Sequence, residues 1–125
     1  MEANDFVKEL NDVQELMRNE RYPEALIILG KLKEADKEGS FDYNLTHKLY
    51  QLISNSQSLY NQQRVLSVVK EISHTEKSIS FIELNDILKK QENVELDELI
   101  LRREVEILIL RSLLECKIEG NDLVF

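Results

Sequence analysis

The fold class is decided by two stretches in the last third of the chain, Ser78-Ile79-Ser80-Phe81-Ile82-Glu83-Leu84 and Lys117-Ile118-Glu119-Gly120-Asn121-Asp122-Leu123-Val124-Phe125. In the first stretch, Ile79 and Phe81 alternate with serines, and this alternation predicts a short strand. The second stretch predicts two strands that are joined by a Gly-Asn-Asp turn. Between them, apolar residues recur at helical spacing over residues 83–90 and again over residues 96–116.

A short strand, two helices and a two-stranded wing follow one another in the order that is typical of a winged helix. The predicted helix over residues 96–116 carries more apolar residues than an amphipathic surface helix needs. We therefore expect it to be the central helix of the module, covered by its neighbours on one side and by the wing or a partner on another. The pattern favours a binding module over an enzyme.

The first seventy residues carry helical patterns. Asp5 is predicted to cap a helix that ends near Asn19, and Pro23 suits the first turn of the next helix. The phrase over residues 19–26 resembles the turn of a tetratricopeptide-type hairpin. The residues expected to form the stripes of the two helices are Phe6, Leu10, Val13 and Met17 on the first and Leu26, Ile27, Leu29 and Leu32 on the second.

Two breaks divide the remaining helical region. Lys37-Glu38-Gly39-Ser40 is predicted to end the second helix, and Asn44 to cap a third. A further break is expected around Ser54-Asn55-Ser56, before a strongly apolar helix over residues 59–73. The predicted fold is therefore mainly α, with a short tetratricopeptide-like helical array in residues 1–56. A winged-helix subdomain with a small antiparallel sheet is expected in residues 57–125.

Composition limits the classes of function. The chain has 125 residues, 42% of them hydrophobic, and 16 Lys and Arg against 24 Asp and Glu give it a net charge of -8. This average charge repels phosphate backbones, so nucleic-acid binding is not expected without a local basic face. No stretch approaches the roughly 20 apolar residues of a membrane span, and a signal-peptide pattern is lacking. With a single cysteine, the chain is expected to be a soluble protein of the cytoplasm or nucleus.

Catalytic and metal-binding motifs are not found in the sequence. His47 and His74 are the only histidines, and neither has cysteines or acids at ligand spacing beyond what an acidic chain supplies by chance. Phosphate-binding glycine loops and nucleophile-elbow motifs are lacking. Cys116 is expected to be a packed, inert thiol. We therefore expect no enzymatic activity, no cofactor and no metal.

Four phrases follow one another through the second half of the chain: Leu66-Ser67-Val68-Val69, Ile79-Ser80-Phe81 with Leu84, Val105-Glu106 with Ile109, and Cys116-Lys117-Ile118-Glu119. In this order they resemble the PCI domain, the module shared by the proteasome lid, the signalosome and translation initiation factor three. The resemblance covers roughly residues 44–125. Within the family, the signalosome subunit seven class is the most similar, and the M subunit of translation initiation factor three is next.

The sequence also departs from the family pattern. Residues 91–103 look longer than the usual connection between the last two helices, and the helical array is short for the family. The typical Asp-Gln of the wing is Glu119-Gly120 here. Relatives usually continue into a terminal helix where this chain stops at Phe125, so we expect either a reduced member of the family or a fragment, although Met1 favours a natural start.

The resemblance implies an assembly function, because PCI modules pair through the strands of their winged helices and so build an arc of subunits. It implies a non-catalytic scaffold subunit of a signalosome-like complex, with other PCI-domain subunits as partners and self-association when isolated. An apolar strand edge at the end of the wing would be a template for another chain's strand. The predicted contact residues are Ile79, Phe81, Lys117, Ile118, Leu123, Val124 and Phe125. In the alternative interpretation, these residues only close the chain's own sheet.

Other functions stay open at this point. One is a winged-helix nucleic-acid-binding protein in transcription or messenger-RNA export, with Arg102, Arg103 and Arg111 as contact residues. Another is a subunit of translation initiation factor three, and a third is a peptide-holding adaptor built on the helical hairpin. The acidic run Glu92, Glu95, Asp97 and Glu98 is expected to be a solvated segment that starts a helix, with docking of a basic partner as its alternative.

Overall fold

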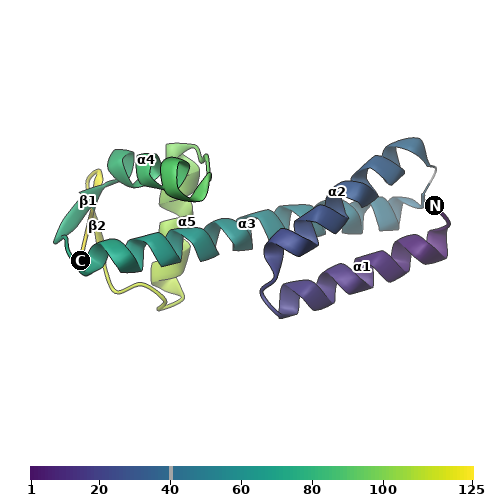
Figure 1. Cartoon of the computed structure of the whole chain (residues 1–125), viewed down its shortest axis with the longest axis horizontal. Helices are drawn as coiled ribbons and strands as arrows, with labels where there is room; N and C mark the ends of the chain where they lie inside the picture. The colour runs from purple at the N-terminus through teal and green to yellow at the C-terminus, as the bar shows by residue number, and fades with distance from the viewer. Residues whose placement is uncertain (40) are drawn as a thin grey trace. The chain divides into compact units, whose positions relative to one another are not determined.

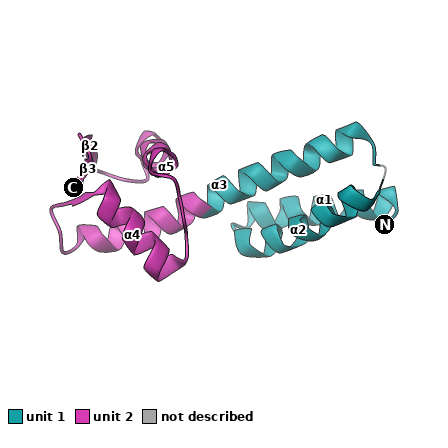
Figure 2. Cartoon of the chain, turned by 90° about the horizontal axis from the view of Figure 1, so that it is seen from above, with its two compact units in different colours: residues 1–60 teal, residues 61–125 magenta. Residues whose placement is uncertain are grey.

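The computed structural model describes residues 1–39 and 41–125, and Figure 1 shows the order of their helices and strands. The structure is mainly helical (72%) and contains a small three-stranded antiparallel sheet. It consists of two compact units, Met1–Tyr60 and Asn61–Phe125 (Figure 2). The mainly α fold with a small antiparallel sheet is therefore confirmed.

Unit 1 contains α1 (Ala3–Arg18), α2 (Tyr22–Glu38) and the first part of α3 (Tyr43–Ser73). α1 packs against α2, and the ring of Phe6 lies 4.4 Å from that of Phe41, centroid to centroid. The core of unit 1 is formed by Phe6, Leu10, Val13, Ala25, Leu29, Leu32, Leu49 and Leu52.

The predicted stripes of the first two helices are largely confirmed. On α1, Phe6, Leu10 and Val13 are buried, and α2 buries Leu29 and Leu32. The prediction for Ile27 was wrong, because this side chain is 63% exposed. Ala25 takes the inward position instead, since a spacing of four and then three residues places it on the same face as Leu29 and Leu32.

Two predicted caps are corrected. α1 begins at Ala3 with Glu2 at its N-cap, so Asp5 lies inside the first turn, where its charge still suits the positive end of the helix. At the start of α3, the Oδ1 atom of Asp42 accepts a hydrogen bond from the N–H of Asn44 at 2.8 Å. Asp42, and not Asn44, therefore caps the start of α3.

The start and end of α2 agree with the sequence. Pro23 lies in its first turn, where a missing N–H costs nothing, and the helix ends at Glu38 with Gly39 as C-cap. Ser40, the last residue of the predicted break, lies outside the described residues.

The break expected around Ser54-Asn55-Ser56 does not occur, because α3 runs without interruption from Tyr43 to Ser73. Serine and asparagine cost only a few tenths of a kcal/mol each in a helix, and this segment contains neither Gly nor Pro. The flanking apolar residues Leu52 and Val65 are buried, and their packing offsets that small cost.

Unit 2 contains the last part of α3, then β1 (Ser78–Ser80), α4 (Phe81–Glu92), α5 (Glu98–Leu110), β2 (Lys117–Glu119) and β3 (Asp122–Val124). The strands form an antiparallel sheet in the order β1-β3-β2. Leu123 lies between Ile79 on one side and Ile118 on the other. The core of unit 2 is formed by Val65, Val68, Val69, Ile79, Phe81, Leu84, Leu88, Val94, Leu101, Val105, Leu108, Leu114 and Leu123.

The boundary between β1 and α4 differs from the prediction. Phe81 was expected in the strand, but it is the first residue of α4. The Oγ atom of Ser80 accepts a hydrogen bond from the N–H of Glu83 at 3.1 Å and so caps the helix. The ring of Phe81 is fully buried, and it shares the inner face of α4 with Leu84 and Leu88.

α5 is shorter than predicted. Asp97 caps its start, and the helix ends at Leu110, well before Cys116. Ser112 then takes a φ of +60°, which a continuing helix does not allow. The long connection expected over residues 91–103 is also wrong, because only residues 93–97 separate α4 from α5. Asn93, in the left-handed region, ends α4.

We expect Gly120→Ala to lower the stability of the chain by about 1–2 kcal/mol, since Gly120 has a φ of +61° in the β2–β3 turn. A Cβ atom at this position would meet no atom within 4 Å, so the cost is one of backbone conformation alone. The matched control is Gly30→Ala in α2, where a Cβ atom also has open space. This change should stabilise the chain by about 0.5–1 kcal/mol. Thermal unfolding followed by circular dichroism measures both, and shifts of the same sign would contradict this account.

Candidate protein-interaction site

The sheet of unit 2 has two outer strands, β1 and β2, because β3 pairs with both of them. The apolar edge that the sequence predicted at Leu123, Val124 and Phe125 was therefore placed on the wrong strand. β3 is the central strand, and both of its sides are used within the chain.

The hydrogen bonds around β3 determine which backbone groups face outward. The N–H of Phe81 donates to the carbonyl of Asn121 at 2.9 Å, and the N–H of Phe125 donates to the carbonyl of Lys77 at 3.0 Å. In an antiparallel pair this pattern turns the N–H and C=O of Leu123 toward β1. The neighbours of Leu123 on β3 then bond to β2. Ile118 lies opposite Leu123 on β2, so its own N–H and C=O point away from β3. Ile118 thus presents a donor and an acceptor at the open edge of β2.

A groove of about 650 Å³ runs beside this edge, between β2 and the last turn of α5. Its apolar lining comes from Ile109, Leu110, Cys116 and Ile118, and its charged lining from Glu106, Lys117 and Glu119. Leu110 is 83% exposed although it is a large apolar side chain. We call this surface, groove and open edge together, the β2 site.

The predicted contact residues are distributed between the core and the surface. Phe81 and Leu123 are fully buried and Ile79 is 5% exposed, so their side chains serve the core of unit 2. Val124 and Phe125 are half-buried. Lys117 and Ile118 line the β2 site.

Sequence reasoning missed the contribution of α5 to this site, which comes from Glu106, Ile109 and Leu110. A signal was present, because the predicted helix carried more apolar residues than one buried face needs. Leu108 faces the core, whereas Leu110 is exposed. Only the direction of α5 relative to the sheet determines which of its apolar residues are buried.

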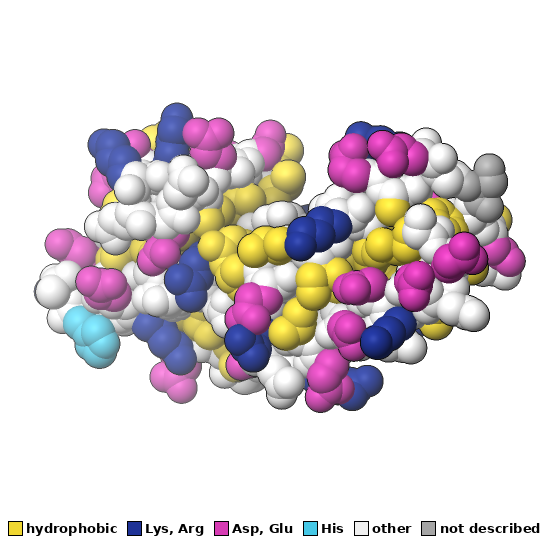
Figure 3. Space-filling view, turned by 45° about the vertical axis from the view of Figure 1, so that its right-hand side comes forward, with side chains coloured by type: hydrophobic (Ala, Val, Ile, Leu, Met, Phe, Trp, Pro, Cys, Tyr) yellow, Lys and Arg dark blue, Asp and Glu magenta, His cyan; other side chains and the backbone are white. Residues whose placement is uncertain are grey.

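The three arginines proposed for nucleic-acid contact engage three different parts of unit 2. Arg102 donates from Nη2 to the carbonyl of Gly120 at 2.6 Å, and its guanidinium carbon lies 4.8 Å from the centre of the Phe81 ring. Arg103 pairs with Glu104 at 3.3 Å, and Arg111 donates to the Oε1 atom of Gln62 at 3.0 Å. On the face shown in Figure 3, acidic side chains are interspersed with basic ones.

Arg102 joins the start of α5 to the turn between β2 and β3, so we expect Arg102→Met to lower stability by about 1 kcal/mol. Amide hydrogen exchange in residues 119–122 should speed up, because the turn loses its contact with α5. Arg102→Lys keeps the charge but not the planar donor, and should recover only part of the loss. Urea unfolding and hydrogen exchange measure both effects. Arg18→Met, which removes an exposed pair on α1, is the control, and an equal effect there would contradict the role given to Arg102.

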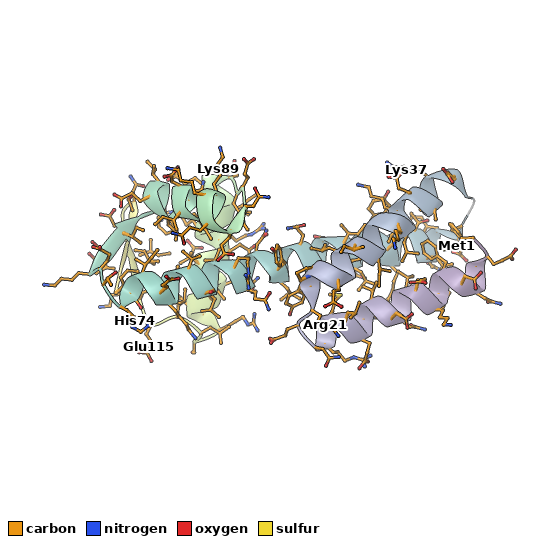
Figure 4. All side chains as sticks on the ribbon, viewed as in Figure 1. Met1, Arg21, Lys37, His74, Lys89 and Glu115 are labelled. Carbon is orange, nitrogen blue, oxygen red and sulfur yellow. The ribbon has the colours of Figure 1, made fainter. Side chains whose placement is uncertain are left out.

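Cys116 and the two histidines are the other side chains that could carry chemistry. Burial raises the pKa of the Cys116 thiol, which makes it a poor nucleophile near neutral pH. His47 stacks on Tyr43 in α3, and His74 follows the end of the same helix, where Figure 4 labels it. Among residues 1–39 and 41–125, no three His, Cys, Asp or Glu side chains are grouped as metal ligands would be.

No protein-family model matches the chain, and no curated protein or solved structure shows significant similarity to it. Within the described part of the chain, none of the helices has the length and apolar character needed to cross a membrane.

Proposed function

We propose that the chain is a non-catalytic scaffold subunit of a multi-subunit PCI complex of the signalosome type, and that it binds a neighbouring subunit through the β2 site. The observation that carries this proposal is the open edge of β2, where Ile118 presents its N–H and C=O beside an exposed apolar groove. Unpaired strand edges of this kind accept a strand from another chain.

The topology of unit 2 supports the proposal. A helix, β1, α4, α5 and the β2–β3 hairpin follow one another in the sheet order β1-β3-β2, which agrees with the order expected for a winged helix. The four PCI-like phrases fall on the last part of α3, the β1–α4 junction, α5 and β2. A helical unit precedes them, as the resemblance to PCI proteins implies.

The groove is needed as much as the edge. β2 has three residues, and only Ile118 offers its backbone to a partner, so strand addition supplies about two hydrogen bonds of roughly 0.5–1.5 kcal/mol each. Covering an exposed leucine contributes about 1.5–3 kcal/mol, which makes Leu110 as important as the backbone bonds. A partner should therefore combine a strand for β2 with an apolar side chain for the groove.

The charges on β2 determine which strand can pair there. Lys117 and Glu119 flank Ile118, and charged residues on an edge strand oppose unselective pairing. A partner strand that carries an acid opposite Lys117 and a base opposite Glu119 would be favoured. Selectivity of this kind suits a fixed neighbour in an assembly.

Affinity purification of the tagged chain from its native source, followed by mass spectrometry, tests the proposal. We expect PCI-domain subunits to co-purify in near-stoichiometric amounts. A monodisperse monomer without any PCI-domain protein would count against the function. If the isolated chain instead binds single-stranded or duplex nucleic acid in a filter assay at low salt, the nucleic-acid alternative would replace it.

A further inference from the structure

A second groove lies on unit 2, between the outer face of α4 and the segment that leads into α5. It has a volume of about 530 Å³, and its walls are held together by a hydrogen bond from Nδ2 of Asn85 to the carbonyl of Leu96, 2.9 Å long. The groove is lined by Ile82, Glu83, Asn85, Asp86, Lys89, Glu95, Leu96 and Glu98, and we call it the acidic groove. None of these residues belongs to the β2 site.

The charges of the acidic groove are strongly unequal. Four carboxylates line it against one ammonium group, that of Lys89, which extends outward from α4 (Figure 4). Glu95 lies 3.6 Å from Lys89, and Asp86 pairs with Lys90 at 2.9 Å. Within residues 1–39 and 41–125, Glu83 and Glu98 have no ion-pair partner. Two carboxylates at the rim are thus available to cations from outside.

Exposed apolar side chains lie beside these carboxylates. Ile82 is 70% exposed at one wall, and Leu96 is half-buried at the other. Leu99, which follows Glu98 in the first turn of α5, is 77% exposed. An acidic segment that is merely solvated needs no such residues, whereas a docking groove uses them to add contact area to the ion pairs.

We propose that the acidic groove binds a short basic segment of a partner protein. Its Lys or Arg side chains pair with Glu83 and Glu98, and one apolar side chain of the segment lies between Ile82 and Leu96. Charge complementarity selects this occupant, because an acidic or neutral segment would leave the rim carboxylates uncompensated. The same charges oppose a second copy of this acidic chain as the occupant. The acidic groove is independent of the function proposed for the β2 site.

The test is fluorescence anisotropy with the full chain and a fluorescein-labelled peptide of the sequence Gly-Arg-Leu-Arg-Lys-Leu-Arg-Gly. We expect saturable binding at low salt that weakens as salt rises. The double variant Glu83→Gln and Glu98→Gln should weaken binding about tenfold, since two ion pairs are lost. Ile82→Ser should weaken it as well, because the apolar contact is lost. Both changes lie on the surface, and circular dichroism verifies that the fold is kept.

The matched control is the double variant Glu106→Gln and Glu119→Gln at the β2 site, which changes the net charge by the same amount. It should change peptide affinity by less than about twofold. An equal loss in both double variants would overturn the proposal, because the net charge of the chain would then be the cause. Absence of binding at low salt would also overturn it. A third result would overturn the proposal as well: the peptide does not bind, and the Glu83 and Glu98 double variant changes the oligomeric state of the chain. The occupant of the acidic groove would then be a second copy of the chain.

Discussion

Replacing Phe81 by alanine is expected to unfold most of unit 2 under conditions in which the unaltered chain is folded. The ring is fully buried among residues of the unit 2 core, and the guanidinium of Arg102 covers one of its faces. Removal of a buried phenylalanine side chain costs about 3–5 kcal/mol. A small unit has a total stability of only a few kcal/mol, so this loss is comparable with the whole.

Urea unfolding and two-dimensional amide NMR measure this loss. Dispersed signals of residues 78–125 should collapse, while those of α1 and α2 should stay dispersed. The control is Ile82→Ala, one residue further along α4, where the side chain is exposed and the change should stay within about 0.5 kcal/mol. Equal effects at the two positions would mean that the inner face of α4 has been assigned to the wrong residues.

The second large effect is expected at the open edge of β2. Ile118→Pro removes the outward N–H but none of the donors that bond to β3. The sheet should therefore persist, because an edge strand tolerates proline at a position whose N–H faces away from the sheet. A proline there can neither donate to an added strand nor let it approach closely. We expect the co-purifying amount of the PCI-domain partner that we propose to fall by on the order of tenfold or more. Leu110→Glu should have a similar effect through the groove.

The matched control for the edge is Ser78→Pro on β1. By the same alternation, the N–H of Ser78 also points away from β3, but on the opposite side of the sheet. This variant should keep its partner if β2 is the interface. Retention of the partner by Ile118→Pro together with its loss in Ser78→Pro would move the interface to the β1 edge.

Much of the fold was predictable because it depends on local patterns. The alternation at Ser78–Ser80, the glycine turn at Gly120 and the stripe of Phe6, Leu10 and Val13 each indicate their element directly. The sequence also held the correct start of α4, since Ser80 and Glu83 have the spacing of a capping pair. The strand-like alternation that ended at Phe81 obscured this signal.

The remaining features depend on non-local contacts. Leu113 and Leu114 continue the apolar pattern of α5, but Leu114 reaches the core of unit 2 only because the helix ends at Leu110 and the chain turns at Ser112. Position at a sheet edge is decided by which strands pair, and no residue of β3 reveals that β1 will cover its second side. The sequence did indicate Lys117 and Ile118 as contact residues. It could not assign the open edge to β2, because strand pairing decides which strand lies at the edge.

The claim that β2 is the interface is tested most directly by amide hydrogen exchange at Ile118, in the free chain and in the purified complex. Exchange reports whether an individual N–H is hydrogen-bonded and shielded from water. In the free chain we expect the Ile118 amide to exchange quickly, while that of Leu123, bonded to β1, exchanges slowly. In the complex we expect Ile118 to become protected. Fast exchange at Ile118 in a stable complex would contradict the account.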